Sequence, residues 1–312
     1  MAEDVFVPGD PALMVRDFGG DGPDLVLLHG FGGSALHWES FAPLLTDRFR
    51  VLAPDLRCHG HSGDGQWHWD RLLGDLERAI AHLGIENPAV VGHSLGGAVA
   101  AMWAQRRPEC PGAVDIDGIR AVVTAEENYP GLAPGIASRL RAELSAAFEA
   151  QAAVMAQPIT DAQYEAMREQ QWQLGGEAAV EQFERNLFAT NGTRSMRPSA
   201  AAATAFRAQM NAVDLFPVFT AAACPLLVCA ASTHLAEAEP YAELMAAYRR
   251  GIERDLAAAA RANRNLRIEW LPASHAMVQE QPDLLAALVS DFLDENGPGT
   301  TSTPDSSGTP PA

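Results

Sequence analysis

The chain has 312 residues, of which 47% are hydrophobic and 20% charged, and its formal net charge is −18. Its 22 Lys and Arg residues are all arginine, so no lysine is present for a Schiff base or a phosphate-binding P-loop. Such an acidic surface argues against nucleic acid and anionic lipid as partners, because both bind to basic surfaces.

The first ten residues, MAEDVFVPGD, lack the basic and apolar segments of a secretory signal. No apolar run approaches the about 20 residues that cross a bilayer. We therefore expect a cytoplasmic protein with no membrane partner. The four cysteines have no C-x-x-C spacing and are expected to be free thiols.

Short apolar runs alternate with helical segments in the first third of the chain. Residues 70–84 have apolar side chains at helical spacing and end on glycine, which predicts a helix. Strands that are apolar throughout and separated by helices predict a parallel sheet covered on both faces. The predicted strands lie in residues 25–30, 49–55, 88–94 and 112–118.

The pattern changes from about Val123 to Phe216, where the chain is rich in Ala, Glu, Gln and Arg and contains no convincing strand. Long helices are predicted from residue 138 to 156 and from residue 161 onward. Strands resume in residues 224–231 and 266–273, and a helix over 282–295 follows. We predict an α/β core (1–122 and 217–295), a helical cap (123–216) and a disordered tail (296–312).

Ser94 lies in the sequence Gly92-His93-Ser94-Leu95-Gly96, between an apolar strand and a helical segment. This G-x-S-x-G spacing is typical of a nucleophile elbow, a tight turn that lifts the serine clear of the sheet. A serine hydroxyl needs a base to take its proton. His275 follows the last predicted strand, at the sheet edge where such sites assemble, and is the candidate base.

A second glycine pattern favours a different function. Gly30, Gly32 and Ala35 have the G-x-G-x-x-A spacing of a dinucleotide-binding turn, and Asp55 follows at the distance of a ribose-binding acid. That interpretation leaves Ser94 and His275 without a role. We therefore predict no organic cofactor. We also find no cluster of residues in the sequence that indicates a metal site.

Three segments resemble motifs of the α/β-hydrolase fold, and the resemblance runs from about residue 10 to 295. HGFGGS (29–34) is similar to its oxyanion loop, and GHSLGG (92–97) to its elbow. PDLRCHGHS (54–62) resembles its P-D-x-R-G-x-G-x-S loop, with Cys58 where glycine is usual. The resemblance implies a mostly parallel twisted sheet flanked by helices, a helical cap, and an oxyanion hole formed by the backbone N–H groups of Phe31 and Leu95.

The resemblance leaves two positions for the acid that orients the histidine. The commoner one follows the strand after the cap, where this chain has His234. The other is the end of the strand after the nucleophile, which here offers Asp117 and Asp115. We favour Asp117 because it lies at the strand's mouth, with Glu237 as the next candidate.

These residues together imply hydrolysis of a carboxylic ester or lactone, through an acyl-enzyme on Ser94. The acid placement resembles haloalkane dehalogenases and coelenterazine luciferases, and the combination with serine resembles zearalenone-type lactonases. Acyl transfer or thioester cleavage uses the same residues, and a non-turnover receptor on this fold can keep them. The substrate is expected to be small and mostly apolar, and the oligomeric state stays open. The expected pocket residues are Gly32, Trp38, His93, Trp172, Phe188 and His234.

Overall fold

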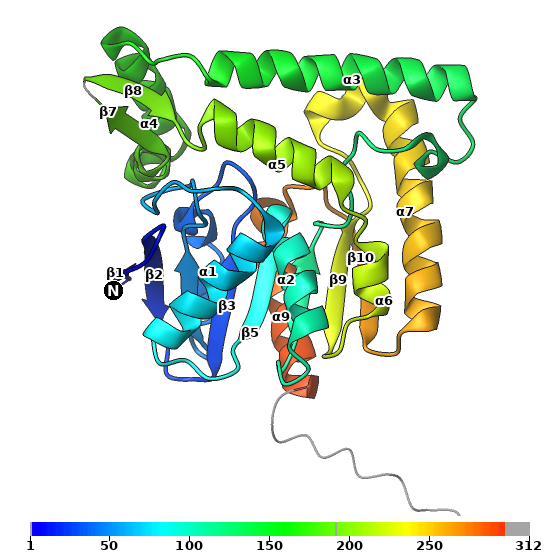
Figure 1. The fold of residues 1–312 in the computed structure, drawn as a ribbon, viewed down its shortest axis with the longest axis horizontal. Coiled ribbons are helices and arrows are strands. Elements are labelled where there is room, and N and C mark those ends of the chain that lie inside the picture. Colours follow the sequence, from blue (N-terminus) through cyan, green and yellow to red (C-terminus); the bar gives the residue numbers. More distant parts are fainter. Residues whose placement is uncertain (1, 191, 297–312) are drawn as a thin grey trace, which may run out of the picture.

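The computed structural model describes residues 2–190 and 192–296 and contains an eight-stranded sheet (Figure 1). The strand order is β1-β2-β4-β3-β5-β6-β9-β10. Strands β1 and β2 pair antiparallel with their neighbours, and the pairs from β4 to β10 are parallel. The strands are β1 (Glu3–Val7), β2 (Leu13–Gly19), β3 (Asp24–Leu28), β4 (Arg50–Pro54), β5 (Ala89–His93), β6 (Ala113–Ile116), β9 (Leu226–Ala231) and β10 (Leu266–Leu271).

Two apolar layers cover the sheet, one on each face. Consecutive residues of β5 belong to different layers, Val90 to one and Val91 to the other, because side chains alternate along a strand. The first layer is completed by α1 (Trp69–His82), α2 (Leu95–Arg106), α6 (Phe216–Thr220) and α7 (Ala242–Ala262). The second is completed by η1 (Ala35–Trp38), η2 (Ala42–Leu44), α8 (Met277–Glu280) and α9 (Pro282–Asn296).

The strand register aligns the carboxyl ends of the central strands. His93 on β5 pairs with Ile116 on β6, which in turn pairs with Cys229 on β9. Ser94 and Asp117 each follow directly after one of these paired residues, so both lie at the same edge of the sheet. This alignment of parallel strand ends is what builds a site from distant parts of the chain.

The insertion between β6 and β9 lies over that edge, with α3 and α5 running across the top of the sheet in Figure 1. It contains η3 (Glu126–Asn128), α3 (Pro134–Met155), α4 (Asp161–Arg185), strands β7 (Leu187–Thr190) and β8 (Thr193–Met196), and α5 (Ala200–Ala212). The fold class predicted above is confirmed, with an eight-stranded, mostly parallel sheet and a helical insertion.

Several elements differ from the expectations. The antiparallel pair β7–β8 lies in the segment for which no strand was predicted. Strands β1 and β2, the 3-10 helix η4 (Ala236–Tyr241) and helix α7 form where no element was assigned. The predicted tail begins at Asn296, which ends α9, and its remaining residues, 297–312, lie outside the described residues.

Two properties of the described chain bear on the remaining expectations. All four cysteines are free, as predicted, and all four are buried. Among the helices of residues 2–190 and 192–296, none combines the length and apolar character that a membrane span requires.

Candidate active site at the carboxyl edge of the sheet

Ser94 lies in a strained turn between β5 and α2. Its φ of 56° and ψ of −113° are unusual for a residue with a side chain. The backbone holds the turn because the Ser94 N–H donates to the Ile116 carbonyl (2.8 Å) and the Ser94 carbonyl accepts from Ala98 (3.1 Å). The side chain is partly exposed, as the elbow pattern predicts for a nucleophile.

The glycines on either side of Ser94 are required by close backbone approach. A Cβ at Gly92 would lie 2.0 Å from the Gly96 carbonyl oxygen. A Cβ at Gly96 would lie 2.0 Å from the Leu28 carbonyl oxygen on the neighbouring strand β3. Since atoms cannot approach to these distances, the turn forms only with glycine at both positions.

His275 and Asp117 are brought together from positions 158 residues apart. His275 Nδ1 donates to Asp117 Oδ2 at 2.7 Å. The other carboxylate oxygen of Asp117 accepts from the Ala231 N–H at 3.0 Å, at the end of β9. With its Nδ1–H fixed in this way, the neutral His275 ring keeps Nε2 free to accept a proton.

The surroundings of His275 favour its protonated form more than water does. Partial burial by itself lowers the pKa of His275, but the hydrogen bond and the negative charge of Asp117 outweigh that effect and raise it above the usual value. A raised pKa makes His275 a stronger base toward a serine hydroxyl than a free imidazole is.

Asp115 lies two residues before Asp117 and has a different environment. It is fully buried, its Oδ1 accepts from the Gly118 N–H at 2.7 Å, and its Oδ2 has no hydrogen-bond partner in the part of the chain described. Burial raises the pKa of Asp115 to about 8, and the nearby charge of Asp117 acts in the same direction. At neutral pH the Asp115 carboxyl is therefore mostly uncharged, unlike a group that stabilises an imidazolium.

The loop after β3 passes beside the serine. A Cβ at Gly30 would lie 3.3 Å from Ser94 Cβ, so the two backbones are almost in contact. Buried His29 fixes the loop, because its Nδ1 donates to the Gly30 carbonyl (2.7 Å) while its Nε2 accepts from the Leu56 N–H (3.0 Å). Phe31 follows in this loop, and Leu95 opens α2, where an N–H has no acceptor within the helix.

The predicted pocket residues lie in several different environments. Gly32 has a φ of 78° with open space around it in the same loop. Trp38 is fully buried in the layer that contains α9, so it is a core residue and not a pocket wall. Trp172 and Phe188 are about half exposed on α4 and β7.

Two predicted pocket histidines already use ring nitrogens in hydrogen bonds within the protein, both nitrogens in His234 and one in His93. His234 accepts from Arg249 Nη1 through Nδ1 (3.1 Å) and donates to Glu239 through Nε2 (2.9 Å). His93 is 7% exposed and donates through Nε2 to the His275 carbonyl at 2.8 Å. Neither position resembles that of a residue that faces a bulky ligand.

An aromatic side chain of the insertion that was not predicted from the sequence lies against the loop after β3. Phe206 on α5 stacks on Phe31 with ring centroids 4.0 Å apart, and its other neighbour is Trp67 at 5.2 Å. Phe206 lies in an alanine-rich helix, where no local pattern distinguishes a core aromatic from one that faces a site. Its contacts place α5 directly over the loop beside Ser94.

Asp55, considered above as a ribose-binding acid, anchors the insertion instead. It is fully buried, and its carboxylate accepts from Arg185 Nε of α4 at 3.0 Å and from the N–H groups of Ala35 and His61. A carboxylate occupied in this way has no free oxygen directed at a ribose. No group of three or more potential metal ligands gathers within residues 2–190 and 192–296.

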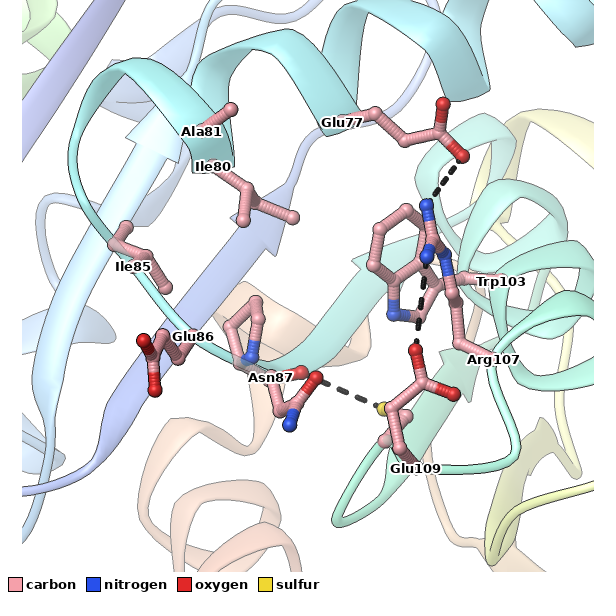
Figure 2. A pocket seen from close by; sticks show the side chains of 11 residues that line it. Glu77, Ile80, Ala81, Ile85, Glu86, Asn87, Trp103, Arg107 and Glu109 are labelled. Atoms are coloured by element: carbon pink, nitrogen blue, oxygen red, sulfur yellow. Dashed lines mark hydrogen bonds and ion pairs between the residues drawn. The ribbon is translucent and has the colours of Figure 1, made fainter.

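A cavity of about 390 Å³ lies away from Ser94, between the ends of α1 and α2 and the start of β5 (Figure 2). Arg107 crosses it, with ion pairs to Glu77 (2.7 Å) and Glu109 (3.6 Å). This is the amino edge of the sheet, opposite to Ser94, and Arg107 pairs with two of the three carboxylates that line the cavity. The cavity therefore has no part in the chemistry at Ser94.

Comparison with known protein families shows that the model of the alpha/beta hydrolase family matches residues 25–288. The chain belongs to the alpha/beta hydrolase family. The match includes the loop after β3, the elbow, the insertion and His275.

Curated relatives of this chain match over part of their length. A soluble epoxide hydrolase of a Corynebacterium species is 34% identical over 36% of this chain and 40% of its own length. A pimeloyl-[acyl-carrier protein] methyl ester esterase of Aeromonas hydrophila is 32% identical over 42% of this chain and 51% of its own. The chain thus matches about half or less of the length of these relatives.

Solved structures resemble the chain over most of its length. An E-2-(acetamidomethylene)succinate hydrolase has a TM-score of 0.66 with 21% identity, and covers 94% of this chain and 100% of its own. The enol-lactonase from Burkholderia xenovorans LB400 has a TM-score of 0.61 with 23% identity and the same coverage. At this level of identity the likeness shows the fold alone.

Proposed function

We propose that this protein hydrolyses a carboxylic ester or lactone through an acyl-enzyme on Ser94. The observation that carries the proposal is the Asp117–His275 hydrogen bond at the sheet edge where the strained Ser94 turn lies. A serine at an elbow, a histidine with one nitrogen held by a carboxylate, and nearby backbone amides are the components of acyl transfer.

In the first half of the reaction, Ser94 Oγ attacks the substrate carbonyl carbon and His275 Nε2 takes the hydroxyl proton. The N–H groups of Phe31 and Leu95 stabilise the negative oxygen that forms. The tetrahedral intermediate collapses, the C–O bond to the leaving group breaks, and His275 gives its proton to that oxygen. In a lactone, the released hydroxyl stays attached to the acyl chain.

In the second half, His275 takes a proton from water as the water oxygen attacks the acyl carbon. Collapse of the second intermediate returns the proton to Ser94 and releases a carboxylic acid. Asp117 keeps the ring in the correct tautomer and stabilises the imidazolium in both halves.

The substrate class rests on the insertion and on the relatives. Phe206 stacks on Phe31 of the loop that passes beside Ser94, and this aromatic pair favours an apolar acyl or cyclic group. A methyl ester esterase and an enol-lactonase are among the similar proteins, and both names describe hydrolysis of an ester bond. In this proposal residues 123–216 form the cap over a core made of residues 1–122 and 217–295.

The test is steady-state hydrolysis of a p-nitrophenyl ester series and several macrocyclic lactones by wild type and Ser94→Ala. We expect turnover by wild type and a loss of at least about 10³-fold in the variant. Activity that survives in Ser94→Ala contradicts the mechanism. Labelling of Ser94 by a phosphonate without multiple turnover of any ester points instead to a receptor.

A further inference from the structure

His93, the residue before Ser94, contacts the catalytic histidine in two ways. Its ring packs against His275 with centroids 4.8 Å apart, and its Nε2 donates to the His275 carbonyl at 2.8 Å. We propose that His93 is a positioning residue that fixes the backbone and ring of His275 for proton transfer. This role rests on the function proposed above and assigns His93 no contact with substrate.

The tautomer of His93 follows from its partners. The carbonyl of His275 accepts a proton, so the hydrogen must be on His93 Nε2. Nδ1 then carries no hydrogen, and it is buried with no hydrogen-bond partner within the described residues. It lies against the oxyanion loop, since a Cβ at Gly30 would be 3.3 Å away. His93 therefore connects the loop beside Ser94 with the backbone of His275.

A second histidine, on η1, packs against the His93 ring. His37 of η1 stacks on His93 with centroids 5.0 Å apart and an interplanar angle of 6°. Gln279 lies within 3.3 Å of His37 Nδ1, so the stack also contacts α8, just beyond His275. Because this stacking fixes the orientation of the His93 ring, its Nε2–H points at the His275 carbonyl.

His93 stays uncharged over the pH range of the proposed reaction. Burial lowers its pKa to about 3, and the neighbouring His275 and His37 act in the same direction. The opposing influences are its hydrogen bond to the His275 carbonyl and the charge of Asp117. Asp115, which also faces His275, is itself mostly neutral there because its pKa is about 8. A neutral substitute for His93 thus changes geometry without removing a charge.

The experiment compares His93→Phe, which keeps a ring but has no N–H, with His93→Gln, which keeps a donor near the Nε2 position. The readouts are the kcat/KM–pH profile and the low-field ¹H NMR signal of the Asp117–His275 proton. We expect kcat/KM to fall about tenfold in His93→Phe, the equivalent of one hydrogen bond. His93→Gln should stay within about threefold of wild type.

The pH profile separates positioning from loss of packing. In His93→Phe the His275–Asp117 hydrogen bond should weaken, so the pKa of His275 should fall toward its usual value. The acid limb of kcat/KM then moves to lower pH, since His275 must be neutral to act as a base. His82→Phe on the exposed surface of α1 is the matched control and should leave both readouts unchanged.

An unchanged acid limb and NMR signal in His93→Phe, with only a lower Tm, overturns the proposal. Equal losses in His93→Phe and His93→Gln also overturn it, because the hydrogen bond is then not what matters. The NMR signal and the His275 titration require no substrate, so they test His93 even if no ester is turned over. Failure of the proposed function is thus distinguishable from failure of this inference.

Discussion

Around Ser94 the backbone passes so close to itself that there is no room for a side chain at the flanking glycines. The insertion, by contrast, is joined to the core through two buried arginines. At the elbow, the Gly96 Cα lies against the Leu28 carbonyl, and hydrogen bonds join β5 to β6 at Ser94. In the insertion, Arg185 reaches Asp55 (3.0 Å) and Asp4 (2.7 Å) on the core. The first region is fixed by local geometry, and the second depends on pairs distant in sequence.

Arg197 makes the second of these connections. Its Nη1 donates to the carbonyls of Gly60 (2.7 Å) and Ser62 (2.6 Å), in the loop that follows β4. Both arginines bind the loop that contains Asp55, so one end of the insertion is tied to the core by buried charge. Changes at the elbow should therefore affect catalysis or folding as a whole, while changes at these arginines should loosen one region.

The largest effect is expected from Asp117→Asn. Asp117 accepts from both the His275 Nδ1–H and the Ala231 N–H, whereas an uncharged amide has a single acceptor oxygen, so His275 loses both its tautomer and its electrostatic support. We expect kcat for ester hydrolysis to fall about 10⁴-fold with little change in stability. A fall of less than tenfold, measured beside an unchanged Tm, contradicts the assignment of Asp117, and Glu237 becomes the candidate if Asp115→Asn is also without effect.

Gly96→Ala tests whether the elbow is limited by sterics. The new Cβ would meet the Leu28 carbonyl oxygen at 2.0 Å and the Leu28 carbonyl carbon at 2.5 Å, so the backbone would have to shift. We expect a loss of at least about 4 kcal/mol in the free energy of unfolding, measured by urea denaturation. The control is Gly74→Ala in α1, where nothing lies within 4 Å and the change should stabilise by about 0.5–1 kcal/mol. Equal stabilities of the two variants would contradict the steric account.

Arg185→Met tests the buried charges that hold the insertion. It leaves Asp55, which is fully buried, without its cation, and a buried unpaired charge costs about 3–5 kcal/mol. Arg168→Met, which removes an exposed ion pair with Glu184, should cost less than about 1 kcal/mol. Urea denaturation measures both. If the two variants are equally stable, Arg185 contributes no more than a surface pair does.

The same contrast explains what the sequence predicted. Ser94 and the central strands are specified by neighbours within a few residues, so apolar runs and the G-x-S-x-G spacing were sufficient to predict them. The Arg185–Asp55 pair joins residues 130 positions apart, and nothing beside either residue marks the other as its partner. Asp55 accordingly fitted a dinucleotide spacing that its buried environment does not support.

The remaining differences have local explanations. The hairpin β7–β8 was missed although the sequence carries Asn191-Gly192, a strong hairpin signal, because its four-residue strands are too short for a clear alternation. Trp38 was expected among the residues that line the pocket. It turns into the core because η1 packs its apolar side against the α9 layer.

The smallest effect is expected from Asp115→Asn, which makes the same substitution as Asp117→Asn two residues away. Burial raises the pKa of Asp115 to about 8 in the folded protein, whereas the unfolded chain has the ordinary value near 3.8. The folded state therefore binds the proton more tightly, and this contribution to stability is complete below about pH 4 and lost as pH rises through 8.

Asp115→Asn removes that titration without removing the hydrogen bond to the Gly118 N–H, because the amide oxygen can accept it. We expect kcat within a few-fold of wild type and a stability that changes less between pH 5 and 8. At pH 8 the variant should be more stable than wild type by on the order of 2 kcal/mol. A pH dependence identical to that of wild type shows that Asp115 does not hold a proton. If Asp115→Asn instead loses as much activity as Asp117→Asn, then Asp115 is the acid. A neutral carboxyl could not support His275 to that extent, so Asp115 would have to be ionised.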